Sequence, residues 1–189
     1  SLVQRGMELT RFPVLQTYYM WMNTDDPVIG GYSKEKVALR RAISLSYNSP
    51  EDIALLKKGF AIRAESPLPP NVLGHDPAYR SPVGYNPVLA NALLDRFGYG
   101  KRDPDGFRRG PDGLPLTLTM HSEATVGGRL RDELWRKNLT AIGLRVAFRS
   151  DKKTEIIKAS RLGKVQMFES NWIADFPDGD NFYQLLYGP

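Results

Sequence analysis

The chain has 189 residues, enough for one domain with a substantial core or for two small ones. It contains no cysteine, which excludes disulfides, zinc–thiolate sites and a cysteine nucleophile. The 26 basic and 21 acidic residues give a net charge of +5, but stretches such as RLRDELWRK mix both signs, which indicates solvated helix faces rather than a nucleic-acid-binding stripe.

The N-terminal part of the chain predicts one strand followed by two helices. Residues 14–23, VLQTYYMWMN, are rich in β-formers and predict the strand. Apolar residues at helical spacing predict a helix over 34–47, capped by Ser33. A shorter helix is expected to begin with Ser49 as its cap and to end at Gly59.

A connector rich in proline and glycine follows, over residues 64–87, and predicts irregular structure. Asn86 and Pro87 then begin a third helix, which ends at Gly98. The helical spacing predicts that this helix buries four side chains, Leu89, Leu93, Leu94 and Phe97.

The second half of the chain alternates regularly between strands and helices. Strands are predicted over 114–122, 144–148 and 164–172, with helices over 128–143 and 152–163 between them. The first of these helices is amphipathic through Leu130, Leu134, Trp135, Leu139 and Ile142. Short links between such elements indicate an α/β fold with parallel strands joined by right-handed crossovers. Ligands bind such sheets beyond the carboxyl ends of the strands, which is where the tail after Trp172 lies.

A calcium loop is one interpretation of DPDGFRRGPDG, residues 103–113. The EF-hand pattern fails, because Phe107, Arg108 and Leu114 occupy positions that need an oxygen ligand, a glycine and a glutamate. A hairpin turning at PDG between Phe107 and Leu116 is favoured instead.

No catalytic set is visible in the sequence. His75 and His121 have no partner at ligand or triad spacing, and the common nucleophile, zinc and phosphate-loop motifs are missing. Paired carboxylates remain as an alternative, since Asp175, Asp178 and Asp180 follow one another closely and a glycosidase-like hydrolase needs two such groups. A basic nucleic-acid-binding module is a second alternative.

Asp175 suggests a more specific hypothesis. A carboxylate in an aromatic-walled site can pair with the ammonium group of a ligand, and Trp172 or Phe176 can stack on the ligand. The alternative is that Trp172 packs in the core and that Asp175 caps the following turn. Asp178 and Asp180 are expected to be turn and cap residues, before a helix that begins at about residue 181.

Six stretches in the same order resemble family 5 of the bacterial extracellular solute-binding proteins, the dipeptide-, oligopeptide- and nickel-binding receptors of ABC importers. They are KVALRRAISLSYN, GFAIRAESPLPPNVLGHDP, YNPVLANALLDRFGY, DPDGFRRGPDGLPLTLTM, LWRKNLTAIGLRV and NWIADFPDGDNFYQLLYGP. Together they cover nearly the whole chain. Each stretch alone is a loose match, but six in the family's order make the resemblance specific.

The resemblance implies a periplasmic binding protein-like fold of type II, with a mixed sheet, parallel crossovers and flanking helices. Residues 1–189 would form a single lobe that corresponds to most of the second lobe of a two-lobed protein. The first lobe and the C-terminal stretch that returns across the hinge would be absent. In peptide-binding members the aspartate of W-x-x-D pairs with the α-amino group of the peptide, and this position falls on Asp175, with Trp172 nearby. The sequence DFPDGD departs from the family's common DYPDP, so the loop after Asp175 is expected to differ in shape.

The expected function is therefore that of a periplasmic, monomeric substrate-binding component. It would capture short peptides and deliver them to an ABC permease in the inner membrane. The resemblance implies no enzymatic activity, no cofactor, no metal and no nucleic acid. Nickel- and sugar-binding relatives share the scaffold, so the ligand itself stays open.

Overall fold

The computed structural model describes residues 5–8, 10 and 12–187, and the chain divides into two compact units. The smaller unit comprises Ser1–Tyr18, Ala64–Arg80 and Asn171–Pro189, and the larger comprises Tyr19–Arg63 and Ser81–Ser170. The organisation as a single lobe stays a prediction. No helix within the described ranges is long and apolar enough to cross a membrane.

Four strands form one sheet in the order β1-β4-β2-β3. Their bounds are Gln16–Met22 for β1, Thr117–Glu123 for β2, Arg145–Asp151 for β3 and Met167–Ile173 for β4. β2 pairs in parallel with β3 along its whole length, from Thr117 opposite Arg145 to Glu123 opposite Asp151, and it also pairs in parallel with β4. The predicted α/β fold with parallel crossovers is confirmed.

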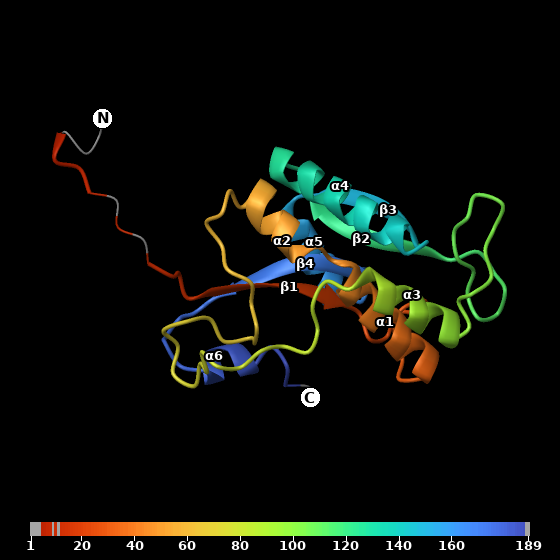
Figure 1. The fold of residues 1–189 in the computed structure, drawn as a ribbon, viewed down its shortest axis with the longest axis horizontal. Helices are drawn as coiled ribbons and strands as arrows, with labels where there is room; N and C mark the ends of the chain where they lie inside the picture. The colour runs from red at the N-terminus through yellow and green to blue at the C-terminus, as the bar shows by residue number, and fades with distance from the viewer. Residues whose placement is uncertain (1–4, 9, 11, 188–189) are drawn as a thin grey trace. The chain divides into compact units, whose positions relative to one another are not determined.

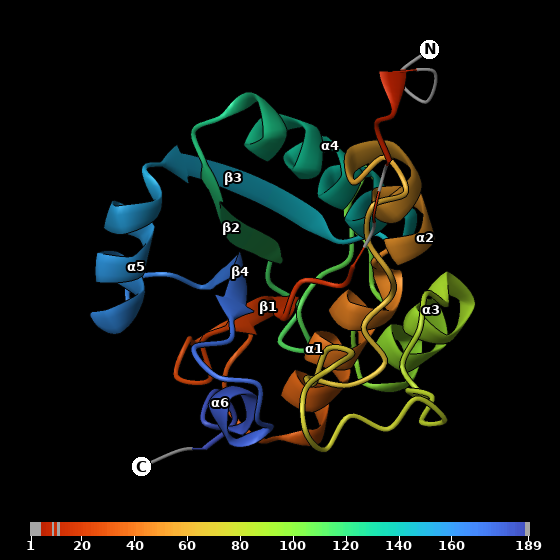
Figure 2. The ribbon, with the colours of Figure 1, turned by 90° about the vertical axis from the view of Figure 1, so that its left-hand side faces the viewer.

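Two helices make these crossovers. α4 (Val126–Ala141) connects β2 to β3, and α5 (Lys153–Arg161) connects β3 to β4. Because β3 and β4 lie on opposite sides of β2, right-handed crossovers in the two directions place α4 and α5 on opposite faces of the sheet. Figure 2 shows the two helices on different sides of these strands.

Alternate residues of β4 confirm the two faces. Met167 joins the main hydrophobic core, which contains Trp135 of α4, whereas Phe168 packs in a separate cluster with Ile156 of α5. Two further helices, α1 (Lys34–Ser46) and α3 (Pro87–Arg96), pack against each other and contribute to the main core (Figure 1).

The helix caps follow the sequence with one exception. Ser33 Oγ accepts a hydrogen bond from the backbone N–H of Lys36, and Asn86 Oδ1 accepts one from Leu89, as predicted. Ser49 is wrong as a cap. It is already the first residue of α2 (Ser49–Glu51), and Asn48 Oδ1 accepts the hydrogen bond from the N–H of Glu51 at 3.2 Å. A short π-helix, η2 (Asp52–Leu56), continues the chain.

Two expected core residues are exposed, Leu89 at 42% and Leu130 at 54%. In α3 the buried residues are Ala90 and Leu94, so the residue after Leu89 is buried in its place. The first half of α4 buries Asp132 in place of Leu130, because Ser122 Oγ donates a hydrogen bond of 2.9 Å to the Asp132 carboxylate and makes its burial tolerable. These two burial predictions were therefore wrong.

Candidate functional site

The tail after β4 lies in the smaller unit, where the connector over residues 64–80 holds it. The chain leaves β4 at Ile173, turns, and ends in the short helix α6 (Asp180–Tyr183). The backbone N–H of Leu73 donates to Pro177, and the carbonyl of Leu73 accepts from Gly179, both at 3.0 Å. Two bonds to one connector residue fix the loop between strand and helix.

Asn181 organises the inside of this loop. Its Oδ1 accepts a hydrogen bond from the indole Nε1 of Trp172 at 2.7 Å and another from the backbone N–H of Asp175 at 3.2 Å. The residue is only 2% exposed. The sequence interpretation missed Asn181 as a site residue, because an asparagine in the first turn of a short helix gives no sign that its side chain folds inward.

The Trp172 ring is half-buried, so it cannot offer both of its faces to a ligand. It packs against a small cluster of Leu68, Val72 and Phe182, and its one polar atom is occupied by Asn181. This arrangement agrees with the core alternative for much of the ring. A contact between a ligand and Trp172 stays a prediction.

Asp175 and Phe176 point outward. Both are exposed, Phe176 at 49%, and within residues 5–8, 10 and 12–187 no group pairs with the Asp175 carboxylate. α6 has no side-chain cap, and its cap residue is Gly179, so Asp175 does not cap this helix. An exposed carboxylate beside an exposed ring, on a loop fixed from inside, can receive a cationic group.

The other two tail aspartates have local roles. Asp178 Oδ1 accepts a hydrogen bond from the backbone N–H of Asp180 at 3.0 Å, and Asp180 is the first residue of α6. The predicted turn role is confirmed for Asp178, whereas the predicted cap role is wrong, because the cap residue of α6 is Gly179 and no side chain caps the helix. In the part of the chain that is described, no cluster of three or more histidine or acidic side chains could hold a metal ion.

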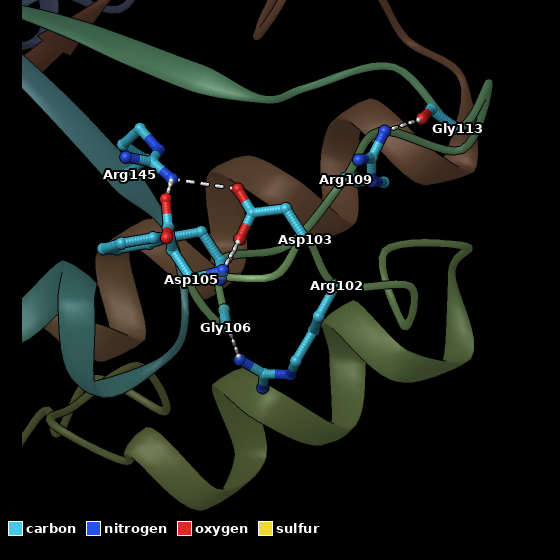
Figure 3. A network of polar contacts seen from close by, with 8 residues as sticks. Arg102, Asp103, Asp105, Gly106, Arg109, Gly113 and Arg145 are labelled. Atoms are coloured by element: carbon cyan, nitrogen blue, oxygen red, sulfur yellow. Dashed lines mark hydrogen bonds and ion pairs between the residues drawn. The ribbon is translucent and has the colours of Figure 1, made fainter.

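The carboxylates of the loop at 103–113 are also occupied. Arg145 Nη2 donates to Asp103 at 2.9 Å and to Asp105 at 3.0 Å (Figure 3). Its guanidinium also lies 4.2 Å from the centre of the Phe107 ring. An arginine thus occupies the place that the calcium interpretation would give to the ion. The predicted hairpin is confirmed by the antiparallel bridge between Arg109 and Pro115.

Residues 2–189 match the sequence profile described as bacterial extracellular solute-binding proteins, family 5 middle. The chain belongs to this family. It is 32% identical over 146 residues to the di/tripeptide-binding protein 2 of Pseudomonas aeruginosa, a match that covers 76% of this chain and 25% of that protein.

Solved structures of the same fold agree. The periplasmic binding protein DppA of Helicobacter pylori, in complex with the peptide STSA, superposes with a TM-score of 0.73 at 25% identity, over 90% of this chain and 29% of that one. NikA of Brucella suis, in complex with Fe(III)-EDTA, gives a TM-score of 0.71 at 23% identity, over 93% of this chain and 34% of that one. The chain thus spans about a quarter to a third of the length of these proteins, and the expected type II binding-protein fold is confirmed.

Proposed function

We propose that this chain is part of the substrate-binding component of an ABC importer that captures short peptides. The names of the Pseudomonas and Helicobacter relatives support a peptide as ligand. The NikA complex contains a metal chelate on the same fold, so the fold alone does not select the ligand. The observation that carries the proposal is the unpaired, exposed carboxylate of Asp175 on a loop anchored by Asn181.

In this proposal Asp175 receives the α-amino group of the peptide. A carboxylate forms charge-assisted hydrogen bonds with an ammonium group, and the exposed ring of Phe176 offers a face for the same cation or for the apolar part of the ligand. When the binding cleft closes and water is excluded, a ligand without an ammonium group leaves the carboxylate unpaired, which makes Asp175 a specificity device.

The proposed role is binding without turnover. Of the tail aspartates on which the hydrolase alternative depends, Asp178 is engaged in a turn with the backbone N–H of Asp180. The family's description as extracellular supports a location outside the cytoplasm, which we take to be the periplasm. The partner would be the importer's permease in the inner membrane, and the binding protein would act as a monomer.

The test compares peptides with free and acetylated amino termini on the whole binding protein, by calorimetry. Asp175→Asn should weaken binding of the free peptides by about tenfold to about a hundredfold, because hydrogen bonds to charged groups contribute roughly 1.5–3 kcal/mol. Binding of acetylated peptides should not change. Asp178→Asn, a few residues away, is the matched control and should leave the discrimination intact.

If free and acetylated peptides bind the wild-type protein equally well, Asp175 does not have this role. Product release from a glycoside would instead support the hydrolase alternative. Retention on DNA that falls steeply with salt would support the basic module.

A further inference from the structure

The stretch that includes and follows the end of η2 combines basic and apolar residues without any acid. Residues 54–63, ALLKKGFAIR, contain three cations and no carboxylate. Three large apolar side chains of this stretch are exposed, Leu55 at 65%, Phe60 at 70% and Ile62 at 68%. We call residues 54–63 the basic turn, and all of it lies in the larger unit.

Hydrogen bonds fix the backbone of the basic turn. The N–H groups of Lys57 and Gly59 donate to carbonyls of η2 at 3.0 Å and 2.8 Å, and the N–H of Phe60 donates to the carbonyl of Lys57 at 2.8 Å. Lys58 and Gly59 have φ values of 51° and 73°, positive as at the two central positions of a type I′ turn. A left-handed lysine is uncommon and strained. Because the turn is already ordered, binding through it costs little conformational entropy.

The far end of the basic turn is tied to a second segment of the larger unit. Arg63 Nη2 donates a hydrogen bond of 2.9 Å to the carbonyl of Val83. The side chains of Val83 and Tyr85 in that segment are themselves exposed. The segment therefore adds apolar surface beside the turn, and exposed apolar surface on this scale is typical of an interaction site.

The composition of the basic turn selects among possible partners. A nucleic acid offers phosphates to the cations but no apolar interior to Leu55 and Ile62. Protein interfaces are depleted of lysine, whereas at a bilayer surface the lysine stem packs among apolar groups and the ammonium reaches the headgroups. A bilayer with anionic headgroups thus accommodates both the cations and the exposed apolar side chains. We propose that the basic turn docks the protein on the surface of an anionic phospholipid bilayer.

Docking through so few side chains is weak and reversible. One lysine or arginine near an anionic surface strengthens binding about fivefold, and a few apolar side chains bury less surface than a lipid anchor does. Reversible docking lets a binding protein search the membrane that contains its permease and leave again. This use of the surface rests on the proposed function, whereas the binding of lipid does not.

The experiment measures co-sedimentation of the whole binding protein with two kinds of vesicle, one of phosphatidylcholine and one with equal amounts of phosphatidylcholine and phosphatidylglycerol. Binding to the anionic vesicles should be at least about tenfold tighter at low salt and should decline as salt is added. Lys58→Glu replaces a cation by an anion and should weaken this binding by about tenfold or more. Lys152→Glu makes the same change at an exposed lysine before α5 and, as the control, should leave binding nearly unchanged.

A second pair of variants tests the apolar part of the surface. Phe60→Ser combined with Ile62→Ser should weaken binding to the anionic vesicles by at least about tenfold, because two apolar side chains no longer enter the bilayer surface. Tyr32→Ser removes a ring that is exposed at 83% but lies outside the basic turn, and it should leave vesicle binding unchanged. Calorimetry with free peptides should give the wild-type affinity for every variant, which shows that each is folded.

Equal binding to the two kinds of vesicle, or binding to anionic vesicles that survives the variants of the turn, would overturn the proposal. Phe60→Cys, as a single cysteine labelled with a polarity-sensitive dye, identifies other occupants. Its emission should shift to the blue only when anionic vesicles are added. Emission that is already blue-shifted without vesicles would mean that the rest of the protein or a second copy covers the turn, and it would overturn the proposal too.

The peptide measurements separate this inference from the proposed function. A wild-type protein that binds peptides but no anionic vesicles would refute the docking surface and leave the proposed function standing. A wild-type protein that binds anionic vesicles but no peptides would refute the proposed function and support the docking surface, without the use assigned to it.

Discussion

The indole N–H of Trp172 donates a 2.7 Å hydrogen bond to Oδ1 of Asn181, and this bond connects the end of β4 with α6. The backbone N–H of Asp175, within the loop that they enclose, shares the same acceptor. The loop that presents the candidate ligand carboxylate is therefore positioned by a buried amide that does not itself face the solvent.

Replacement of Asn181 by leucine, which is similar in size and has no acceptor, should lower the free energy of unfolding by about 1–3 kcal/mol. The reason is that two donors lose their buried partner. Urea denaturation of the wild type, Asn181→Leu, Trp172→Phe and the double variant measures the coupling between the two side chains. A coupling of about 1 kcal/mol is expected. Additive effects would mean that the bond contributes nothing in solution.

The two neighbouring glycines at the start of α4 should respond to alanine in opposite directions. A Cβ at Gly128 would overlap the carbonyl oxygen of Glu123, which is backbone and cannot move aside cheaply. A Cβ at Gly127 would meet only Thr125 Oγ1, at 3.9 Å. Gly127→Ala should therefore stabilise the protein by up to about 1 kcal/mol through helix propensity, whereas Gly128→Ala should destabilise it by about 1–3 kcal/mol.

Thermal unfolding of the two variants under the same conditions provides the comparison. Each is the control for the other, because the substitution and the helix are identical. Similar melting temperatures for Gly127→Ala and Gly128→Ala would show that the close approach of Glu123 to Gly128 does not constrain this turn.

Features that depend on residues close to one another in the chain were predictable from the sequence. The strands, the parallel crossovers and the caps Ser33 and Asn86 depend on periodicity or on residues three positions apart. The inward turn of Asn181 depends on Trp172, nine residues away, and on a connector about a hundred residues earlier in the chain. The burial of Asp132 depends on Ser122 of another strand, so helical spacing alone favoured Leu130 in its place.

Arg108 was unpredictable for the same reason. In the sequence it is one of two adjacent arginines in a polar loop, but in the structure it is 1% exposed. Its guanidinium donates to the carbonyls of Tyr99 and Ile142 and to the side chains of Asn91 and Asp95. Arg108 thus joins α3 to the turn before β3, a role that no local pattern indicates.

Arg108→Lys should destabilise the protein by about 3 kcal/mol or more. A lysine ammonium cannot reach these acceptors in the geometry of a guanidinium fork, and several buried polar groups would lose their partner. Arg109→Lys, one residue later, should cost less than about 1 kcal/mol, because Arg109 is less buried and makes one bond, to the carbonyl of Gly113 (Figure 3). Guanidinium chloride denaturation measures both, and equal losses would contradict the role assigned to Arg108.

Glu169 should give the stability of the protein a pH dependence that Glu169→Gln removes. Burial raises the pKa of this carboxyl above its ordinary value of 4.5, and the opposing effects of Arg131 and Trp135 do not cancel the shift. The folded state therefore holds the proton more tightly than the unfolded state. The contribution of Glu169 is most favourable below the ordinary pKa and declines as the pH rises towards the folded-state pKa.

Glutamine resembles the protonated carboxyl and does not titrate. The free energy of unfolding of Glu169→Gln, relative to that of the wild type, should therefore increase between about pH 4 and about pH 7. Urea denaturation at intervals across this range measures the difference. A difference that falls with rising pH would show that the ion pair with Arg131 outweighs burial, because the charged form of Glu169 would then be the one that the folded protein prefers.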